Sequence, residues 1–451
     1  MGASQRSPQI SPPLTSIEIC AGAGGQAVGL HHAGFEHYAL VELDPHAVAS
    51  LGRNVREHKW PGWDTRWTTG PEAMNVKDLH DSELLKNLDL APGQLDLLAG
   101  GVPCPPFSLA GKQLGKDDER DLFPEMLRIV SKLMPKAVMI ENVRGILDPP
   151  EVFIDYRRSI VESLGELGYV VPEIDEEWTA KEQDEAMRSV WRRLDACDFG
   201  VPQLRPRAIL VAIHEDYVNG NSFTWPKRLL GKRATVADYL KESMQERCSA
   251  FSGKNSLGEP ARGDELTGET IFEKWYEAAK SAERSPSQGI APTLVGGSKK
   301  HGGADLGPTR AKNAWKTLGV DANGVANDPH ECVPDRDLFR EDGPMLTVEQ
   351  AAIIQGFPRT WKFSGGKTAR YRQVGNAFPP PVAEAVGRAI AAVLRPELRD
   401  KLLAGYEMDT AESVTDAPAE PRQIAAFRYS DVGVATSPRK NRRRDLVGAD
   451  V

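Results

Sequence analysis

The sequence predicts an α/β fold with a doubly wound, mostly parallel sheet and a smaller inserted domain. Between residues 16 and 213, short apolar runs alternate with amphipathic stretches, which is the pattern of βαβ units. After residue 213 this alternation is lost, and it resumes only at residue 346. A helix predicted at 381–394 would then return to pack on the first sheet, so the middle of the chain is interpreted as an insertion.

Five apolar runs are predicted as strands, at residues 16–20, 38–42, 95–99, 137–141 and 208–213. An amphipathic stretch at 121–133 is predicted as a helix between two of them. The polar, charged stretches 235–251 and 269–284 also favour helices, while the segments that follow them are rich in glycine.

These patterns divide the chain into five parts. A flexible N-terminus (1–15) precedes the first domain (16–218), and the inserted domain (219–343) is followed by a return segment (344–399). The remainder, 400–451, is rich in acidic and small residues and ends in a basic cluster at 439–444, which is typical of a disordered tail.

The bulk composition fits a soluble globular protein. The 451 residues are 40% hydrophobic and 27% charged, and the length suggests two or three structural units. No apolar run approaches the roughly 20 residues that span a bilayer, and the N-terminus lacks the apolar block of a signal peptide, so a cytoplasmic protein without a membrane partner is expected. The five cysteines are scattered without a CxxC pair, so neither disulfides nor a metal site is expected.

The formal net charge of −8 argues mildly against a protein that coats nucleic acid. Positive charge is nevertheless concentrated at residues 298–318, where only Asp305 opposes a group of basic residues: Lys299, Lys300, Arg310, Lys312 and Lys316. This glycine-rich segment could follow a phosphate backbone, and a solvated loop is the alternative interpretation.

Residues that follow predicted strands deserve attention first, because open α/β sheets bind ligands at the carboxyl ends of their strands. The sequence IEICAGAGG (17–25) leads from a strand into a turn in which Gly22, Gly24 and Gly25 would let the backbone approach a ligand. Glu42 ends the run YALVE, where a carboxylate suits the ribose hydroxyls of an adenosine-containing cofactor. A surface glutamate before a helix is the alternative for Glu42.

A third strand leads into LDLLAGGVPCPPFS (95–108), in which Cys104 lies among Pro103, Pro105 and Pro106. Prolines stiffen such a loop, and cysteine is an intrinsically strong nucleophile, so Cys104 is a candidate catalytic nucleophile. A structural cysteine in a tight turn is the alternative.

Glu141 directly follows the apolar run AVMI, which would place its carboxyl beside Cys104 at the same sheet edge. A carboxyl there could hydrogen-bond a pyrimidine and stabilise the negative charge that develops when a thiolate adds to the ring. A carboxylate that only caps a strand end is the alternative.

Arg205 and Arg207 alternate at the entry to the last predicted strand, so both side chains would point to one face. Two guanidinium groups on one face suit phosphate, and solvated arginines at a strand edge are the alternative.

Taken in order, these segments resemble the motif series of the cytosine-C5 DNA methyltransferase family over residues 16–394. GGVPCPPFS resembles the nucleophile loop of the family, ENV its catalytic glutamate motif, and QLRPR its Gln-x-Arg-x-Arg motif. QVGNAFPPPVA (373–383) resembles its late Gly-Asn motif. The order of the motifs carries more weight than any one of them.

The resemblance implies that Cys104 adds to C6 of cytosine and that Glu141 binds N3 and the amino group. C5 then takes a methyl group from S-adenosylmethionine, while Arg205 and Arg207 contact the cytosine and nearby phosphates. It also implies a cofactor pocket lined by Cys20, Ala21, Gly22, Gly24, Gly25, Glu42, Leu43, Asp78, Leu79, Pro103 and Asn376.

The implied substrate is double-stranded DNA from which the target cytosine is flipped, with the inserted domain recognising the sequence. Thr293 and Leu294 resemble the recurring Thr-Leu pair of that domain. The DNA contacts that we expect are Ser108, Gln203, Thr293, Leu294, Lys299, Lys300 and Arg310. A monomer associated with the bacterial nucleoid is expected, with a restriction endonuclease of the same specificity as a plausible partner.

The chain departs from the family at several positions. Cys20 stands where the family usually has a phenylalanine that stacks on adenine, and Pro105 replaces the commoner glutamine. The segment GPMLTVEQ lacks residues that are usual in the penultimate motif of the family. Two alternatives remain open: a methyltransferase acting on a tRNA cytosine, which the long inserted domain disfavours, and a catalytically silent DNA-binding relative, which the intact catalytic set disfavours.

Overall fold

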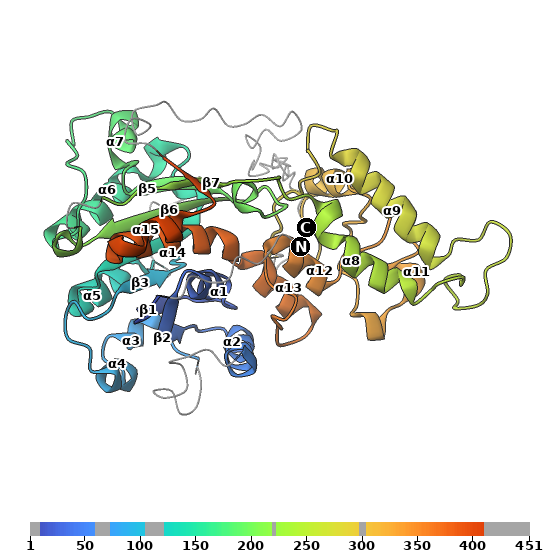
Figure 1. Cartoon of the computed structure of the whole chain (residues 1–451), viewed down its shortest axis with the longest axis horizontal. Coiled ribbons are helices and arrows are strands. Elements are labelled where there is room, and N and C mark those ends of the chain that lie inside the picture. The colour runs from blue at the N-terminus through green and yellow to red at the C-terminus, as the bar shows by residue number, and fades with distance from the viewer. Residues whose placement is uncertain (1–9, 59–72, 104–120, 219–221, 297–303, 410–451) are drawn as a thin grey trace, which may run out of the picture.

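A six-stranded sheet forms the centre of the first part of the molecule (Figure 1). The computed structural model describes residues 10–58, 73–103, 121–218, 222–296 and 304–409. The strands occur in the order β2-β1-β3-β4-β6-β5. Their bounds are β1 (Leu14–Ile19), β2 (Phe35–Val41), β3 (Leu97–Gly100), β4 (Ala137–Val143), β5 (Trp191–Asp195) and β6 (Pro206–Ile213).

The first four strands in this order are parallel, and β6 runs antiparallel to both β4 and β5. The predicted α/β class with a mostly parallel sheet is therefore confirmed. The structure adds β5, which the sequence did not predict because two arginines interrupt its apolar residues.

Helices cover both faces of the sheet, as a doubly wound fold requires. Their bounds are α1 (Gly25–His32), α2 (Pro45–His58), α3 (Val76–Leu79), α4 (Glu83–Leu88), α5 (Phe123–Leu133), α6 (Pro150–Glu166), α7 (Ala180–Met187), α14 (Pro380–Leu394) and α15 (Arg399–Leu403). Successive residues of β3 face opposite sides: Leu97 packs in the cluster that contains α14, and Leu98 in the cluster that contains α5. Both faces of β3 are thus buried, which explains its uninterrupted apolar sequence.

A helical part lies beside the sheet (Figure 1). It contains α8 (Val236–Ser249), α9 (Gly268–Ala282), α10 (Thr309–Thr317), α11 (Pro334–Asp337), α12 (Val348–Gln355) and α13 (Lys367–Asn376). Its core includes the fully buried Trp275 and Trp315 and also Tyr371 of α13. The first half of the predicted return segment, α12 and α13, therefore packs with the helical part.

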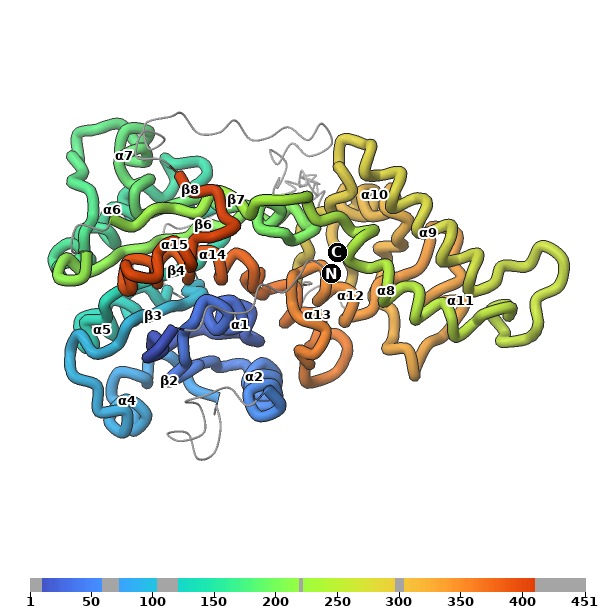
Figure 2. Tube along the Cα trace, viewed as in Figure 1, coloured from blue at the N-terminus to red at the C-terminus, as the bar shows by residue number. Residues whose placement is uncertain are grey.

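The second half of the return segment, α14, packs against α1 at the sheet (Figure 2). This is the return that the sequence predicts for residues 381–394. The predicted tail, in contrast, begins too early, because residues 399–408 form α15 and β8 (Tyr406–Met408). β8 pairs antiparallel with β7 (Pro226–Leu229), and this pairing was hidden by the shortness of both strands. Among the described residues, every helix is too short or too polar to cross a bilayer.

Candidate active site at the carboxyl edge of the sheet

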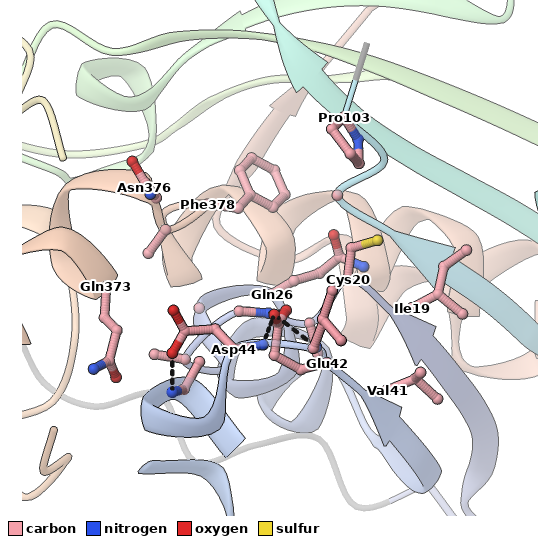
Figure 3. A pocket seen from close by; sticks show the side chains of 18 of the residues that line it. Ile19, Cys20, Gln26, Val41, Glu42, Asp44, Pro103, Gln373, Asn376 and Phe378 are labelled. Carbon is pink, nitrogen blue, oxygen red and sulfur yellow. Dashed lines mark hydrogen bonds between the residues drawn. The ribbon is translucent and has the colours of Figure 1, made fainter. Parts of the chain in front are cut away.

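A cavity of about 480 Å³ lies where the parallel strands end (Figure 3). The turn after β1, the end of β2, the segment after β3 and the end of β4 form one side of it, and α13 with the residues after it forms another. Its lining includes nine of the predicted site residues: Cys20, Ala21, Gly22, Gly25, Glu42, Leu43, Pro103, Glu141 and Asn376. Motifs that are far apart in the sequence thus form one continuous surface.

The turn between β1 and α1 is held by Glu42. One carboxylate oxygen of Glu42 accepts a hydrogen bond from the backbone N–H of Gly22 at 2.8 Å. The other oxygen accepts from the backbone N–H groups of Leu43 at 2.9 Å and Asp44 at 2.8 Å. Gly22 has φ 55°, a left-handed conformation that glycine adopts without cost. Glu42 therefore shapes the turn as well as lining the cavity.

Cys20 also has a left-handed backbone, with φ 52°, and its side chain lines the cavity. Burial, and to a smaller extent the neighbouring Glu42, raises the pKa of the Cys20 thiol to about 12. A thiol with such a pKa stays protonated at neutral pH and is a poor nucleophile. Cys20 therefore belongs to the cavity wall and is not a second reactive thiol.

Two glycines permit the close approach of the C-terminal segment. A side-chain carbon on Gly25 would lie 2.2 Å from the backbone oxygen of Phe378, so only glycine fits there. A side-chain carbon on Gly24 would lie 2.7 Å from the ring of Trp361, whose indole nitrogen donates to the backbone oxygen of Ala23 at 2.9 Å. Gly25 thus lines the cavity, whereas Gly24 packs behind it.

At the end of β4, the carboxyl of Glu141 lies 2.6 Å from Nε of Arg207, and both side chains are largely buried. Burial raises the pKa of Glu141, and the positive charges of Arg207 and Arg205 partly oppose that rise. The next residue, Asn142, donates to the backbone oxygen of Val102 at 2.8 Å. This hydrogen bond fixes the end of β4 against the segment that carries Pro103.

Arg205 occupies a different position from the one that the resemblance implies. Its side chain is 1% exposed, and its guanidinium donates to the backbone oxygens of Leu294, Gly375 and Ala377 at 2.6, 2.7 and 2.9 Å. Because these hydrogen bonds hold the guanidinium inside the protein, Arg205 acts here as a structural anchor and does not line the cavity.

Two predicted cofactor residues also lie away from the cavity. Asn75 caps the short helix α3 by accepting from the backbone N–H of Lys77 at 3.1 Å. One turn later, Asp78 is exposed to solvent and Leu79 is buried in the core behind the sheet. The residues of this segment that line the cavity are instead Met74, Asn75 and Val76.

The predicted DNA contacts divide into three groups. Gln203 and Leu294 are completely buried and bonded to each other, with the Leu294 N–H donating to the Gln203 side-chain oxygen at 2.7 Å. Thr293 donates its hydroxyl to the backbone oxygen of Leu204. These contacts join the helical part to the sheet, so burial contradicts a DNA contact by Gln203 and Leu294 in this conformation. Arg310 is exposed at the start of α10. The third group lies outside the described residues and comprises Ser108, Lys299 and Lys300. The candidate nucleophile Cys104 also lies outside the described residues.

Several lining residues were not predicted from the sequence: Gln26, Asp44, Asn75, Arg372, Gln373 and Phe378. Gln373 and Phe378 lie in the late Gly-Asn motif (373–383), so that motif could have suggested them. Gln26 and Arg372 lie on helices, where a polar residue gives no signal of a site until the packing of the helix is known.

Together, the doubly wound sheet, the glycine turn, the carboxylate after β2 and the cavity at the carboxyl edge define a class, the open α/β proteins that bind a nucleotide-like ligand. Within this class, the model of the C-5 cytosine-specific DNA methylase family matches residues 14–392. The chain belongs to that family, and it is a DNA cytosine-5-methyltransferase.

Two similar proteins agree with this assignment. The chain is 44% identical over 385 residues to the Type II methyltransferase M.NaeI of Lentzea aerocolonigenes, covering 85% of this chain and 76% of the relative. It is 40% identical over 388 residues to the Type II methyltransferase M.NgoMIV of Neisseria gonorrhoeae, covering 85% of this chain and 99% of the relative. A solved structure of a prophage-encoded DNA modification methyltransferase from Escherichia coli matches with a TM-score of 0.48 at 19% identity, covering 85% of this chain and 99% of the other.

Proposed function

We propose that this enzyme transfers a methyl group from S-adenosylmethionine to C5 of a cytosine flipped out of duplex DNA, through a covalent bond between Cys104 and C6. The observation that supports this most strongly is the position of Glu141. Its carboxyl, held by Arg207, lines the same cavity as Pro103, the residue directly before Cys104 in the sequence.

The residues present suit the proposed cofactor. A cavity of about 480 Å³ is within the usual range for a small-molecule site. One carboxylate oxygen of Glu42 accepts from two backbone N–H groups, whereas the other accepts from one and retains a lone pair for a ribose hydroxyl. The buried nitrogens of Gln26 and Arg372 that lack a hydrogen-bond partner among the described residues leave donors for the ligand.

In the proposed mechanism, the Cys104 thiolate adds to C6 while Glu141 gives a proton to N3 of the cytosine. The raised pKa of Glu141 favours its protonated form, which this step requires. Arg207 fixes the orientation of the carboxyl and stabilises the carboxylate that remains after the proton has left.

When bound, S-adenosylmethionine supplies an electrophilic methyl group, which the nucleophilic C5 then accepts. Loss of the C5 proton to a water base lets the bond between C6 and Cys104 break. The proton on N3 returns to Glu141, and both side chains regain their starting states.

Extrusion of the base costs a few kcal/mol, which contacts from the protein must offset. We propose that residues 219–343 act as the target-recognition domain and supply part of these contacts. Among the described residues, Arg310 is the predicted DNA contact that is exposed, and Lys299 and Lys300 lie nearby in the sequence.

The test uses the full-length protein, labelled S-adenosylmethionine and duplex DNA. We expect labelled methyl groups in DNA, and no transfer by Cys104→Ala, while that variant still binds S-adenosylhomocysteine. Cys248→Ala is a matched control because Cys248 is buried in the helical part. Transfer by Cys104→Ala at the normal rate would refute the assignment of the nucleophile, and methylation of tRNA in place of DNA would refute the substrate.

Trapping adds a direct test of the covalent bond. DNA with 5-fluorocytosine at the target cannot release the C5 substituent as a proton, so the enzyme should stay attached to it. Peptide mapping should place the attachment on Cys104. Attachment through Cys20 would contradict the mechanism.

The relatives are named Type II methyltransferases, which are modification enzymes. We propose that this chain likewise acts as a monomer in a restriction-modification system, with an endonuclease that cuts the same sequence as its partner. Mapping of methylated cytosines identifies the sequence. DNA from cells that express the enzyme should then resist an endonuclease of that specificity, and unchanged cleavage would contradict the proposal.

A further inference from the structure

Two cavity-lining side chains contain a buried nitrogen without a hydrogen-bond partner among the described residues. These atoms are Nε2 of Gln26 and Nε of Arg372. Gln26 is only 5% exposed, so its amide is almost completely shielded from bulk water. A buried donor that makes no hydrogen bond destabilises a protein, and its presence in a cavity indicates that a ligand atom is the missing acceptor.

The charges around the cavity point to the same kind of ligand group. Among the described lining residues, Glu42, Asp44 and Glu141 are acidic, and Arg372 is the one basic residue. Glu141 has a cationic partner in Arg207. Arg372 makes no ion pair within the described part of the chain. Its positive charge is therefore available to bind an anionic group of a ligand.

The two donors come from different helices. Arg372 and Asn376 are four residues apart on α13 and therefore share a face of this helix, which borders the cavity. Gln26 is the second residue of α1, and in Figure 3 its side chain points into the space between Cys20 and Phe378. Glu42 and Asp44 lie at the end of β2, the wall to which the ribose is assigned.

We propose that Gln26 and Arg372 form the subsite for the α-carboxylate of S-adenosylmethionine, at the amino-acid end of the cofactor. This inference rests on the proposed use of that cofactor. The carboxylate is the single anionic group of the molecule, and it accepts hydrogen bonds from both donors. A phosphate of duplex DNA is a poorer occupant, because Gln26 is only 5% exposed and backbone phosphates lie on the outside of the duplex.

The test compares two ligands that differ only in this carboxylate: S-adenosylhomocysteine and its decarboxylated analogue, S-adenosyl-3-thiopropylamine. Isothermal titration calorimetry gives the dissociation constant of each for the full-length protein. Arg372→Met should weaken binding of S-adenosylhomocysteine by about tenfold to a hundredfold, and binding of the analogue by less than about threefold. Gln26→Met should act in the same direction with a smaller loss, because its amide is uncharged.

Two further variants complete the design. Arg372→Lys retains a cation and should keep most of the preference for the carboxylate, which also covers the case in which Arg372→Met folds poorly. Arg370→Met is the matched control on α13, because Arg370 is paired with Asp328 at 2.8 Å and does not line the cavity. Its ratio of the two dissociation constants should equal that of the wild type.

Each remaining outcome overturns a specific claim. Equal weakening of both ligands by Arg372→Met and Gln26→Met would overturn the carboxylate subsite while leaving the cofactor assignment intact. Weaker DNA binding by Arg372→Met with an unchanged ligand ratio would assign Arg372 to a phosphate and overturn the inference as well. Failure of the wild-type protein to bind S-adenosylhomocysteine would overturn the proposed cofactor itself.

Discussion

Arg207 lies with its Nε 2.6 Å from the Glu141 carboxyl, across the antiparallel pair of β4 and β6. In the register of this pair, Arg207 faces Val143, two residues beyond Glu141, so both side chains project from one face of the sheet. An antiparallel strand inside a mostly parallel sheet thus brings a cation to the Glu141 carboxyl. This pair is the basis of two predictions.

We expect Glu141→Gln to lower kcat by about a hundredfold to ten-thousandfold, the usual effect of losing a general acid. The amide preserves the size of the side chain, so the affinity for S-adenosylhomocysteine should change little. Single-turnover methyl transfer and calorimetry measure the two quantities. Glu83→Gln, on the exposed surface of α4, is the control. A normal rate in Glu141→Gln would exclude a role for this carboxyl in the reaction.

Arg207→Gln should shift the pH dependence of the reaction. Arg207 lowers the pKa of Glu141 against the effect of burial, so its removal should raise that pKa further. Because the proposed step needs protonated Glu141, the rate falls as pH rises through this pKa, and the fall should begin at higher pH in the variant. Rate profiles of both proteins test this. A shift to lower pH would contradict the electrostatic role of Arg207.

Arg205→Met should destabilise the protein by about 3 kcal/mol or more, because three buried carbonyl oxygens lose their donor. Urea denaturation followed by tryptophan fluorescence measures the change. Arg193→Met is the control, because Arg193 is partly exposed and lies 3.9 Å from its nearest carboxylates. If the Arg205 variant were as stable as this control, the anchoring role would be wrong.

A buried pair behind the glycine turn predicts how stability depends on pH. Glu18 is fully buried, with Oε1 3.2 Å from Nδ1 of His37. Burial raises the pKa of Glu18 to about 8 and lowers that of His37 to about 3. Above pH 6.5, His37 is mainly neutral in both the folded and the unfolded chain. In that range, the contribution of Glu18 to the pH dependence of stability can therefore be distinguished from that of His37.

In the unfolded chain, Glu18 releases its proton near pH 4.5, the ordinary pKa of a glutamate, whereas the folded protein holds that proton up to about pH 8. The stabilising contribution of Glu18 is therefore present at low pH and is lost as pH rises to about 8. Between pH 6.5 and 8, the loss amounts to about 2 kcal/mol in the free energy of unfolding. In Glu18→Gln the slope over this interval should be smaller. An identical slope in both proteins would contradict the prediction.

The sequence predicted those elements whose apolar residues are continuous. β1, β3, β4, β6 and α14 lie within a few residues of their predicted positions because both faces of the sheet are buried. β5 was missed because it is an edge strand with partly exposed arginines, and such a strand lacks a continuous apolar run.

The site residues that directly follow parallel strands could be predicted from the sequence. Glu42, Pro103 and Glu141 line the cavity because parallel strands bring their carboxyl ends to one edge. Residue type alone does not report burial, so the inward positions of Arg205 and Gln203 could not be predicted.

The contribution of α13 to the cavity depends on long-range packing. Arg372 belongs to a helix whose position relative to the sheet is set by contacts with distant segments, such as the hydrogen bond of 2.6 Å from Ser50 to Gln373. No local pattern in the sequence encodes that position.

The anchor formed by Arg205 has a consequence for biosynthesis. Its three carbonyl partners come 89, 170 and 172 residues later in the chain. A nascent polypeptide that has just completed β6 already contains the proposed nucleophile Cys104 and Glu141, but the wall supplied by α13 has not yet been translated. We therefore expect ribosome-bound or truncated chains to be unable to retain a methyl donor, which would spare the host genome from modification by incomplete enzyme.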